Sequence, residues 1–520
     1  YPVVLYLLIY LVIITLFFYT AGLLTIKLII ERSASKVWVN LIYLPLIAAI
    51  FFLGIRGRIE EKAPLRWGVA YFSEYDFANQ LALNPNFTFF KDVIYNAGKQ
   101  EQVKKLMDDI HISDAGIVAR QMLGIEQDST GKKNKRIVSK VHFKEQNKNP
   151  PNVILIVMES FGSTRIGALK NRWEYNLSPC FDAAVDKGIL FTNFYSNGMH
   201  TYTGLFCSLY GYPHLFGKLI MKQVMGRYHF QGLPTILKKH DYKTFFFTTH
   251  DPHFDNMQGF FKANGIEKIF SLLDYDKKEK LSTLGVPDHV IFERALKELR
   301  QLKGKRFFAT LLTASNHGPW SIPDVPFVRI PENEKQSEQL NAFKYSDWAL
   351  GQFLNVLDRD PSFNNTIVVI TADNGNLYKA RLDLDLTQFQ IPLLIYNTDW
   401  KQTKRKLVNR LGSQMDIPAT VMGLIKLDYD NYTFGHDLLD SNTDTTINDF
   451  VHLSEWYKVG YIENGYYHIN RMQGPESLYK VDDITIDLSD SLVEMNREYA
   501  RKALSLYQTA YNNMLLSLDK

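Results

Sequence analysis

Cysteine is nearly absent from this chain of 520 residues, which contains only Cys180 and Cys207. Two cysteines exclude a disulfide-rich scaffold and a thiolate zinc cluster, and they leave one bridge between them as an open alternative. Strong net charge is also absent, because 59 Lys and Arg residues nearly balance 55 Asp and Glu residues. A formal net charge of +4 provides no general attraction to nucleic acid, so we predict no nucleic acid partner.

Several widespread catalytic motifs are missing as well. The chain contains no HExxH zinc motif, no paired CxxC and no Walker phosphate loop. No internal repeat is evident, which argues against a solenoid or a propeller. The remaining composition, 46% apolar and 22% charged, is that of an ordinary globular protein.

Charge is absent from residues 3–24, VVLYLLIYLVIITLFFYTAGLL, a stretch long enough to cross a bilayer as a helix. A second apolar run, residues 37–54, follows a short polar break, so we predict two transmembrane segments in a hairpin. Because residue 1 is Tyr, we expect the chain to be truncated at its N-terminus. A buried core helix is the alternative, and the first run is too uniformly apolar for it.

The rest of the chain divides into three parts that differ in residue composition and hydrophobic pattern. Residues 55–150 are predicted to form a helical connector that ends in a polar, basic linker with two prolines. Residues 151–440 are predicted to form the catalytic domain. Residues 441–520 are predicted to form a smaller C-terminal subdomain, with a hairpin turning at Asn464 and Gly465 and a terminal helical pattern from Ser491.

Short apolar runs rich in β-branched and aromatic residues recur through the predicted catalytic domain. They occupy residues 152–158, 244–248, 306–312, 366–371 and 392–396. Helical patterns such as PDHVIFERALKELRQL lie between them. Alternation of buried strands and helices predicts an α/β fold with a mainly parallel central sheet flanked by helices.

Polar side chains follow four of these strands. Glu159, His250 and His317 come after the first three, and Asp373 and Asn374 follow the fourth. Ligands of open parallel sheets bind beyond the carboxyl ends of the strands, so we expect these residues at one edge. Carboxylate and amide oxygens suit Mg²⁺, Mn²⁺ or Ca²⁺, and the two histidines could bind an anionic substrate or protonate a leaving group. Taken one at a time, each histidine could instead simply order its loop.

A second reactive stretch is SNGMHTYTGLFCSLYGY, residues 196–212, which carries hydroxyls, a thiol and an imidazole. Any of its threonines or serines, or Cys207, could act as a nucleophile once a nearby metal ion or base activates it. The residue types alone do not choose among them.

The segment NVILIVMESFG and the passage that follows it, up to SNG, resemble the opening of the sulfatase and alkaline phosphatase superfamily. MESFG is similar to the lipoteichoic acid synthase group of membrane phosphoglycerol transferases. NQLALNPNFTFF, GSQMDIPATVMGLI, FGHDLL and SLYKVDD are also similar to that group, so the resemblance covers nearly the whole chain. It implies a sulfatase-like catalytic domain behind a membrane anchor.

The resemblance also implies roles for individual residues. Gly198, Thr201 and Gly204 fit the glycine spacing around the family's threonine nucleophile. The family's metal ligands correspond to Glu159, Thr201, Asp373 and Asn374, with Mn²⁺ as the expected ion and Mg²⁺ or Ca²⁺ as alternatives. His317 corresponds to a histidine near the substrate phosphate, and His250 to a second one. Asn374 is a departure, because synthases of this group carry histidine there and sulfatases carry asparagine.

The implied reaction is transfer of a phosphoglycerol headgroup from a glycerophospholipid, such as phosphatidylglycerol, through a phospho-threonine at Thr201. The implied acceptor is an envelope glycan or lipid, and the implied location is the bacterial cytoplasmic membrane with an extracytoplasmic catalytic domain. Alternatives are a phosphodiesterase or phosphatase, a phosphoethanolamine transferase, and a catalytically silent receptor or scaffold. Sulfate ester hydrolysis is not expected, because Cys207 lies in CSLYG and lacks the formylglycine motif.

Overall fold

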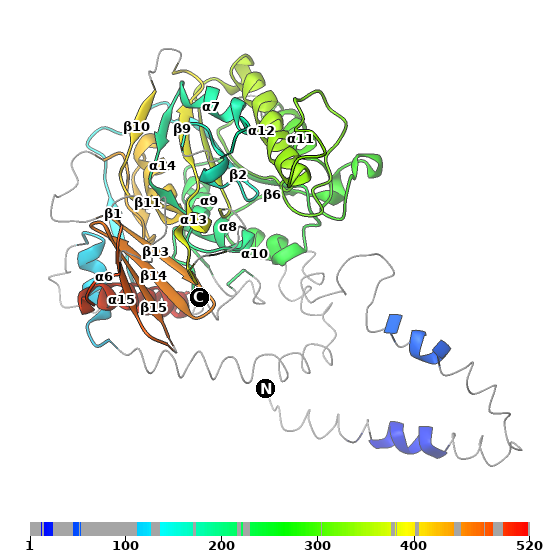
Figure 1. The fold of residues 1–520 in the computed structure, drawn as a ribbon, viewed down its shortest axis with the longest axis horizontal. Coiled ribbons are helices and arrows are strands. Elements are labelled where there is room, and N and C mark those ends of the chain that lie inside the picture. Colours follow the sequence, from blue (N-terminus) through cyan, green and yellow to red (C-terminus); the bar gives the residue numbers. More distant parts are fainter. Residues whose placement is uncertain are drawn as a thin grey trace, which may run out of the picture. The chain divides into compact units, whose positions relative to one another are not determined.

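Five apolar runs of the sequence become neighbouring strands of one central sheet (Figure 1). This computed structural model has an eight-stranded sheet with the order β10-β3-β9-β8-β2-β7-β5-β6. The predicted runs correspond to β2 (Asn152–Met158), β5 (Lys243–Thr248), β7 (Phe307–Leu312), β8 (Thr366–Ala372) and β9 (Leu393–Asn397). Every residue of β7, β8 and β9 is buried, as their continuous apolar composition predicts.

The structure describes residues 12, 15–23, 45–50, 52–53, 112–125, 136–169, 173–215, 220–221, 229–302, 304–375, 380, 382–400, 405–440, 449–472, 474–481 and 492–517. The chain divides into two compact units, Tyr1–Arg66 and Trp67–Lys520. The central sheet and the candidate site belong to the second unit.

The direction of β9 departs from the prediction of a mainly parallel sheet. Strands β2, β5, β7 and β8 run parallel to one another where they pair, but β9 is antiparallel to β8 and also to β3 (Ile189–Phe191). A parallel return from β8 would need a long crossover, usually a helix. The described residues between β8 and β9 contain only the short helix α13 (Leu386–Phe389), so the sheet is mixed.

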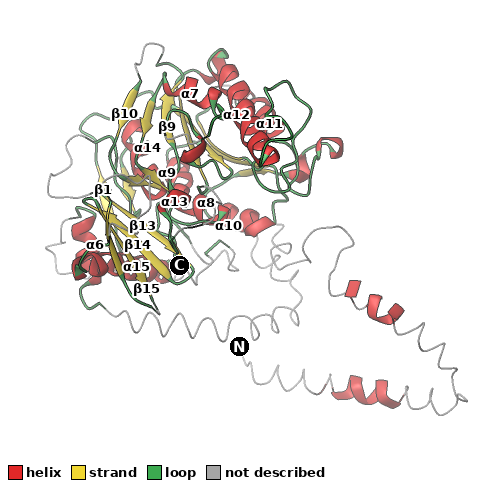
Figure 2. Ribbon diagram, in the orientation of Figure 1, coloured by secondary structure: helices red, strands yellow, loops and turns green. Residues whose placement is uncertain are grey.

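Helices cover the sheet in two groups (Figures 1 and 2). The first group packs α12 against both α7 and α11, and the second packs α8 against α9 and α14. Their bounds are α7 (Pro179–Val185), α8 (Thr201–Tyr210), α9 (Leu233–Lys239), α11 (Asp288–Arg300), α12 (Ser337–Leu357) and α14 (Ile417–Ile425). Helix α11 matches the helical pattern PDHVIFERALKELRQL of the sequence, and α8 places Cys207 and Ser208 in a buried helix.

The C-terminal residues form a second, antiparallel sheet with the order β13-β14-β15-β16. Its strands are β13 (Phe450–Glu455), β14 (Lys458–Glu463), β15 (Tyr466–Arg471) and β16 (Ser477–Lys480). The predicted turn is confirmed, since Asn464 and Gly465 have φ values of 49° and 76°. The terminal helix α15 (Arg497–Leu516) begins later than its sequence pattern suggests, because the Asn496 side chain accepts a hydrogen bond from Glu498 N–H and caps it.

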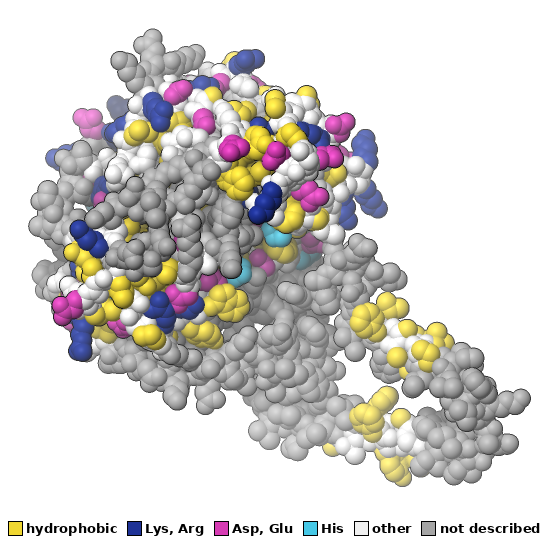
Figure 3. All heavy atoms as spheres, in the orientation of Figure 1, with side chains coloured by type: hydrophobic (Ala, Val, Ile, Leu, Met, Phe, Trp, Pro, Cys, Tyr) yellow, Lys and Arg dark blue, Asp and Glu magenta, His cyan; other side chains and the backbone are white. Residues whose placement is uncertain are grey.

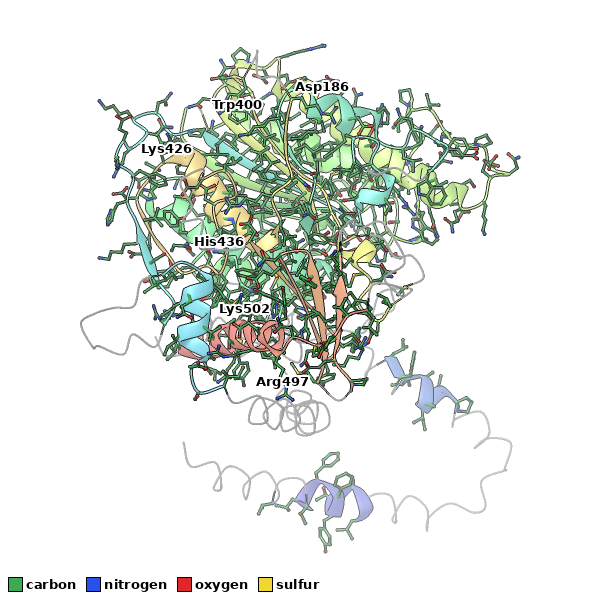
Figure 4. The ribbon with its side chains drawn as sticks, turned by 60° about the vertical axis from the view of Figure 1, so that its left-hand side comes forward. Asp186, Trp400, Lys426, His436, Arg497 and Lys502 are labelled. Carbon is green, nitrogen blue, oxygen red and sulfur yellow. The ribbon has the colours of Figure 1, made fainter. Side chains whose placement is uncertain are left out.

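Successive side chains of β13 point to opposite faces of this sheet, and each face packs against other elements. Val451 and Leu453 belong to a small core with Phe389, whereas the His452 ring stacks against Tyr507 of α15. Helix α15 is also tied to β14 by Lys502 Nζ, which lies 2.8 Å from Glu463 Oε2 (Figure 4). The C-terminal sheet therefore packs on the small core around α13 through one face and on α15 through the other.

The predicted transmembrane segments, residues 3–24 and 37–54, fall mostly outside the described residues. Residues 15–23 and 45–50 are helical, and their apolar side chains are exposed (Figure 3). Within the described part of the chain, none of the helices is both long enough and apolar enough to span a membrane.

Candidate active site

Four neighbouring strands place the predicted polar residues along one edge of the sheet. In the sheet order β8-β2-β7-β5, Asp373 follows β8, Glu159 follows β2, His317 lies in the loop after β7, and His250 follows β5. These strands are mutually parallel, so their carboxyl ends share an edge. The structure thus brings the sequence-predicted carboxylates together on adjacent strands.

The two carboxylates are buried and joined through a short hydrogen-bond network. Ser160 N–H donates to Asp373 Oδ1 at 2.7 Å, and Asn374 N–H donates to the same oxygen at 2.8 Å. The Ser160 hydroxyl lies 2.9 Å from Glu159 Oε1 and 3.2 Å from Asn374 Oδ1. Ser160 itself has φ 49°, a left-handed conformation that non-glycine residues seldom adopt and that concentrates at functional sites.

One carboxylate oxygen of Asp373 takes no part in this network. Asp373 Oδ2 is buried, and no hydrogen-bond partner reaches it from the described residues. A buried carboxylate oxygen without a partner is costly, and a bound cation is one way to satisfy it. Carboxylate, amide and hydroxyl oxygens are hard ligands of the kind that Mg²⁺ and Mn²⁺ accept. The residues therefore fit a divalent ion, although the described part of the chain holds no cluster of three His, Cys, Asp or Glu side chains.

Burial changes the proton affinity of both carboxyls in the same direction. Burial, followed by the charge of Asp373, raises the pKa of Glu159 well above its ordinary value. Burial also raises the pKa of Asp373, and this is opposed by the Ser160 N–H and by the Thr201 hydroxyl that faces the carboxylate. A nearby positive charge would further stabilise two such buried carboxyls as anions.

Thr201 is the first residue of α8, so its hydroxyl stands at the helix N-terminus beside Asp373. Its neighbours in the reactive stretch are placed differently. Thr203 and Ser208 are fully buried, and so is Cys207, whose thiol pKa is raised well above its usual value by burial. Thr201 is only half-buried. Among these four side chains, Thr201 is the one that a substrate could reach.

Two glycines explain why α8 can approach the carboxylates so closely. A Cβ at Gly204 would lie 2.2 Å from the backbone oxygen of Asp373. A Cβ at Gly198 would lie 2.6 Å from the Thr203 side chain. Contacts this short are forbidden to a side chain, so the glycine spacing around Thr201 reflects close packing of the helix on the end of β8.

The two predicted histidines occupy the other half of the edge. His317 is exposed, and its Nδ1 lies 2.7 Å from Gly318 O. His250 is buried, with its ring stacked on Phe254 at 5.0 Å between centroids and its Nδ1 3.2 Å from the Thr248 hydroxyl. The His317 loop follows β7 and His250 follows β5, and these two strands are neighbours in the sheet.

Several residues of the site escape sequence reasoning. The Asn316 amide donates to the carbonyl oxygens of Glu159 and Ser160, and the Gln414 amide donates to those of Ala372 and Asp373. These bonds hold the two strand ends that carry the carboxylates. Asn316 sits beside His317 in the printed sequence and could have been suspected there, whereas Gln414 has no local signal.

The C-terminal sheet also reaches the site. Glu455, the last residue of β13, lies 3.5 Å from His200 Nε2 through Oε1 and accepts a hydrogen bond from Met199 N–H through Oε2 at 3.2 Å. Burial raises the pKa of Glu455, but contacts with His200 and His214 outweigh it and hold that pKa below its ordinary value. Glu455 therefore braces the residues immediately before Thr201, a role that nothing in its local sequence indicates.

Comparison with protein families gives a match to the sulfatase family model over residues 151–427. Among curated proteins, the lipoteichoic acid synthase-like protein YvgJ of Bacillus subtilis is 24% identical over 56% of this chain and 50% of its own length. Lipoteichoic acid synthase 2 of Bacillus subtilis is 27% identical over 56% of this chain and 46% of its own length. The chain thus spans about half the length of these relatives.

Solved structures share the fold over more of the chain. A protein of the alkaline phosphatase superfamily from Vibrio parahaemolyticus aligns with a TM-score of 0.66 and 22% identity, covering 80% of this chain and 96% of its own. The lipoteichoic acid synthase LtaP of Listeria monocytogenes aligns with a TM-score of 0.61 and 18% identity, covering 78% of this chain and 98% of its own. At these identities the likeness establishes the α/β fold with its mixed central sheet.

Proposed function

Because the chain belongs to the sulfatase family and is similar within it to lipoteichoic acid synthases, we propose that it is a metal-dependent phosphoglycerol transferase. The observation that carries this proposal is the position of Thr201. It is the accessible hydroxyl of its stretch, it begins a helix, and it faces a buried carboxylate whose second oxygen has no partner among the described residues.

The proposed reaction has two displacement steps. The Thr201 Oγ attacks the phosphorus of a phosphodiester donor such as phosphatidylglycerol, and the bond from phosphorus to the diacylglycerol oxygen breaks. The Thr201 proton goes to the departing diacylglycerol, which leaves as an alcohol. An acceptor hydroxyl then attacks the phospho-threonine, the bond from phosphorus to Oγ breaks, and the acceptor proton returns to Thr201.

A divalent ion, with Mn²⁺ expected and Mg²⁺ or Ca²⁺ as alternatives, would lower the pKa of the threonine hydroxyl and offset negative charge on the phosphoryl oxygens. Glu159, Asp373 and Asn374 are the side chains that would hold it, together with Thr201. Asp373 Oδ2 has no competing hydrogen bond from the described residues, and Asn374 Oδ1 is shared with the Ser160 hydroxyl.

His317 and His250 are proposed to bind the donor phosphate, and His317 to deliver a proton to the leaving group. The exposure of His317 and its place in the loop after β7, the neighbour of the strand that Glu159 follows, support that role. The hydrogen bond between Nδ1 and Gly318 O fixes the ring, so Nε2 is the nitrogen proposed to meet the leaving group.

Membrane anchoring is part of the proposal. The uncharged residues 3–24 support it, and so do the exposed apolar side chains of helical residues 15–23. We place the protein in the bacterial cytoplasmic membrane, with the catalytic domain outside the cytoplasm and an envelope glycan or lipid as acceptor. Hydrolysis of sulfate esters through Cys207 is not supported, because that side chain is fully buried.

The proposal is tested by incubating the purified protein with a fluorescent phosphatidylglycerol and Mn²⁺ and measuring release of fluorescent diacylglycerol. We expect release that depends on the metal ion and stops when a chelator is added. Release of phosphatidic acid instead would indicate a phosphodiesterase that cleaves the other ester bond. Absence of turnover with phosphatidylglycerol and with phosphatidylethanolamine would support the silent-domain alternative and contradict the proposal.

A further inference from the structure

The turn between β13 and β14 has an unusual composition for its backbone. Trp456 has φ 42° and Tyr457 has φ 62°, so both residues of the two-residue turn lie in the left-handed region. Hairpin turns of this kind strongly favour Asn-Gly or Asp-Gly, because a side chain in that conformation costs about 1–2 kcal/mol. Two aromatic residues are therefore held there against their own backbone preference, which is typical of positions kept for function.

The Trp456 side chain stands next to the residue that precedes the proposed nucleophile. Its ring lies 6.4 Å from that of His200 in an edge-on arrangement, and 71% of its surface is exposed. The His200 ring in turn stacks on Tyr202 with a centroid separation of 5.3 Å. An exposed indole thus continues a row of rings that begins in α8, the helix that starts at Thr201.

Glu455 fixes this arrangement. Its carboxylate contacts His200 Nε2 at 3.5 Å and the Met199 N–H at 3.2 Å, so the turn and the start of α8 are held together by two separate contacts. A single exposed aromatic residue on a surface would need no explanation. Here the strained turn, the brace from Glu455 and the position beside Thr201 occur together.

We propose that Trp456, His200 and Glu455 form an acceptor subsite that binds a pyranose ring of a glycan. This inference rests on the proposed transfer reaction and specifies its second substrate. The apolar C–H face of a sugar would stack on the exposed indole, while ring hydroxyls would hydrogen-bond to the carboxylate and the imidazole beside it. Bound in this way, the sugar presents another hydroxyl toward Thr201 for the second displacement.

A sugar fits the chemistry of this turn better than a lipid chain does. The residues on either side of the two aromatics are Glu455 and Lys458, both charged. Lys458 Nζ pairs with Asp383 at 3.3 Å, so the surroundings of the indole are polar. An acyl chain would need a continuous apolar patch, whereas a sugar needs one flat apolar face edged by hydrogen-bonding groups.

The first test measures binding without turnover. Thr201→Ala protein is titrated with a β-linked gluco-oligosaccharide, and the change in tryptophan fluorescence is recorded. We expect a saturable change that disappears in the double variant Thr201→Ala/Trp456→Phe. An unchanged response in that double variant would overturn the inference, whether or not the protein transfers phosphoglycerol.

The second test measures transfer from fluorescent phosphatidylglycerol to the same oligosaccharide. Trp456→Ala should raise the KM for the oligosaccharide at least tenfold, with a much smaller change in the KM for the lipid, and Trp456→Phe should restore most of the difference. Leu273→Ala removes a side chain that is 70% exposed elsewhere and serves as the matched control. Equal increases in both KM values would show a general structural effect and contradict the inference.

Two further outcomes distinguish failure of the proposed function from failure of the acceptor subsite. If the unsubstituted protein releases no diacylglycerol, the proposed function fails, and the fluorescence titration still decides whether Trp456 binds sugar. If Trp456→Ala weakens sedimentation with phosphatidylglycerol vesicles but leaves the oligosaccharide response intact, the indole is a membrane contact. That result would overturn the acceptor subsite.

Discussion

Thr201 and the carboxylates around it differ from their sequence neighbours in what surrounds each side chain. Thr203 and Ser208 carry the same functional group as Thr201, but they are buried in α8 and removed from substrate. Asp373 has one oxygen satisfied by two N–H groups and another without a partner among the described residues. At the scale of single residues, the accessibility of Thr201 and the unpartnered oxygen of Asp373 support Thr201 as the proposed nucleophile.

Replacement of the proposed nucleophile should abolish activity while leaving the stability of the fold nearly unchanged. Thr201→Ala is expected to lower diacylglycerol release at least about a thousandfold, because no other accessible hydroxyl of the stretch stands beside the carboxylates. The half-buried hydroxyl contributes little to folding, so the free energy of unfolding should change by only about 0.5 kcal/mol. Urea denaturation followed by circular dichroism provides the stability measurement.

Mass spectrometry of the trapped enzyme provides the companion observation. A phospho-adduct is expected on Thr201. Its appearance on Thr203 or Ser208 would show that those residues become exposed during turnover and that the assignment of the nucleophile is wrong.

Removal of one buried carboxylate should weaken metal binding, and this can be measured without any enzymatic activity. Glu159→Gln is expected to reduce the affinity for Mn²⁺ at least tenfold in isothermal titration calorimetry, because one anionic ligand is lost from a buried site. Glu332→Gln, on an exposed residue, is the matched control and should bind the ion as the unsubstituted protein does. Equal Mn²⁺ affinities for the two variants would argue against Glu159 as a ligand.

At the scale of elements, helix α8 delivers Thr201 because it can lie against the end of β8. The contact depends on Gly204, whose hydrogen atom faces the Asp373 backbone oxygen where a Cβ would be only 2.2 Å away. The Gln414 amide donates a hydrogen bond to that same backbone oxygen at 2.8 Å. The end of β8 therefore cannot give way easily, and the helix would have to move instead.

Gly204→Ala should reveal this constraint. Overpacking against backbone costs typically about 1–3 kcal/mol, and a displaced nucleophile loses about a hundredfold in rate. We expect both effects, measured by urea denaturation and by diacylglycerol release. Gly116→Ala is the control, because a Cβ at Gly116 in helix α6 (Ala115–Met122) meets nothing within 4 Å.

The control variant should be as stable as the original or slightly more stable, since alanine is the better helix former. If Gly204→Ala keeps full activity and stability, α8 must be able to move away from β8 without loss, and the close approach would not be required for catalysis.

At the scale of the whole molecule, the chain holds several histidines in its interior in neutral form. Burial lowers the pKa of His452 to about 3 and that of His436, which is labelled in Figure 4, to about 4, from an ordinary value of 6.5. Both lie in the second unit, His452 against α15 and His436 against Phe450 of β13. Lowering the pH should therefore weaken the packing of the C-terminal sheet against its neighbours in this unit.

The sign of the effect follows from proton uptake. Below about pH 6.5 the unfolded chain protonates His436 while the folded chain does not, so folding stability falls as the pH falls toward 4. The loss from this one residue should reach about 3 kcal/mol at pH 4. His436→Leu should remove it, because leucine carries no titratable group and the hydrogen bonds of the His436 backbone N–H and carbonyl can persist.

The urea midpoints of the unsubstituted protein and of His436→Leu are measured at pH 7 and at pH 4. The difference between the two proteins is then compared at the two pH values, which cancels the contribution of other titrating groups. His229→Leu, on an exposed residue, is the matched control. A difference that stays the same at both pH values would mean that His436 is protonated in the folded protein.

The sequence by itself determined the strands, the order of the polar residues after them and the short list of nucleophiles. Continuous apolar runs are local signals, so β2, β5, β7 and β8 appear almost where the residues 152–158, 244–248, 306–312 and 366–371 predict them. The sequence also predicted acidic groups at the ends of β2 and β8, which are neighbours in the sheet. The resemblance to a known family added the choice of Thr201 among the hydroxyls.

Only the tertiary structure decided which of those groups are accessible and what braces them. The antiparallel direction of β9, the burial of Thr203 and Ser208, and the partnerless oxygen of Asp373 depend on how distant segments pack. The contact between Met199 and Glu455 joins residues 256 positions apart. Side-chain patterns report the local chain and its burial, whereas such contacts arise from the packing of distant segments, so no local pattern could have placed Glu455 and Trp456 beside Met199 and His200.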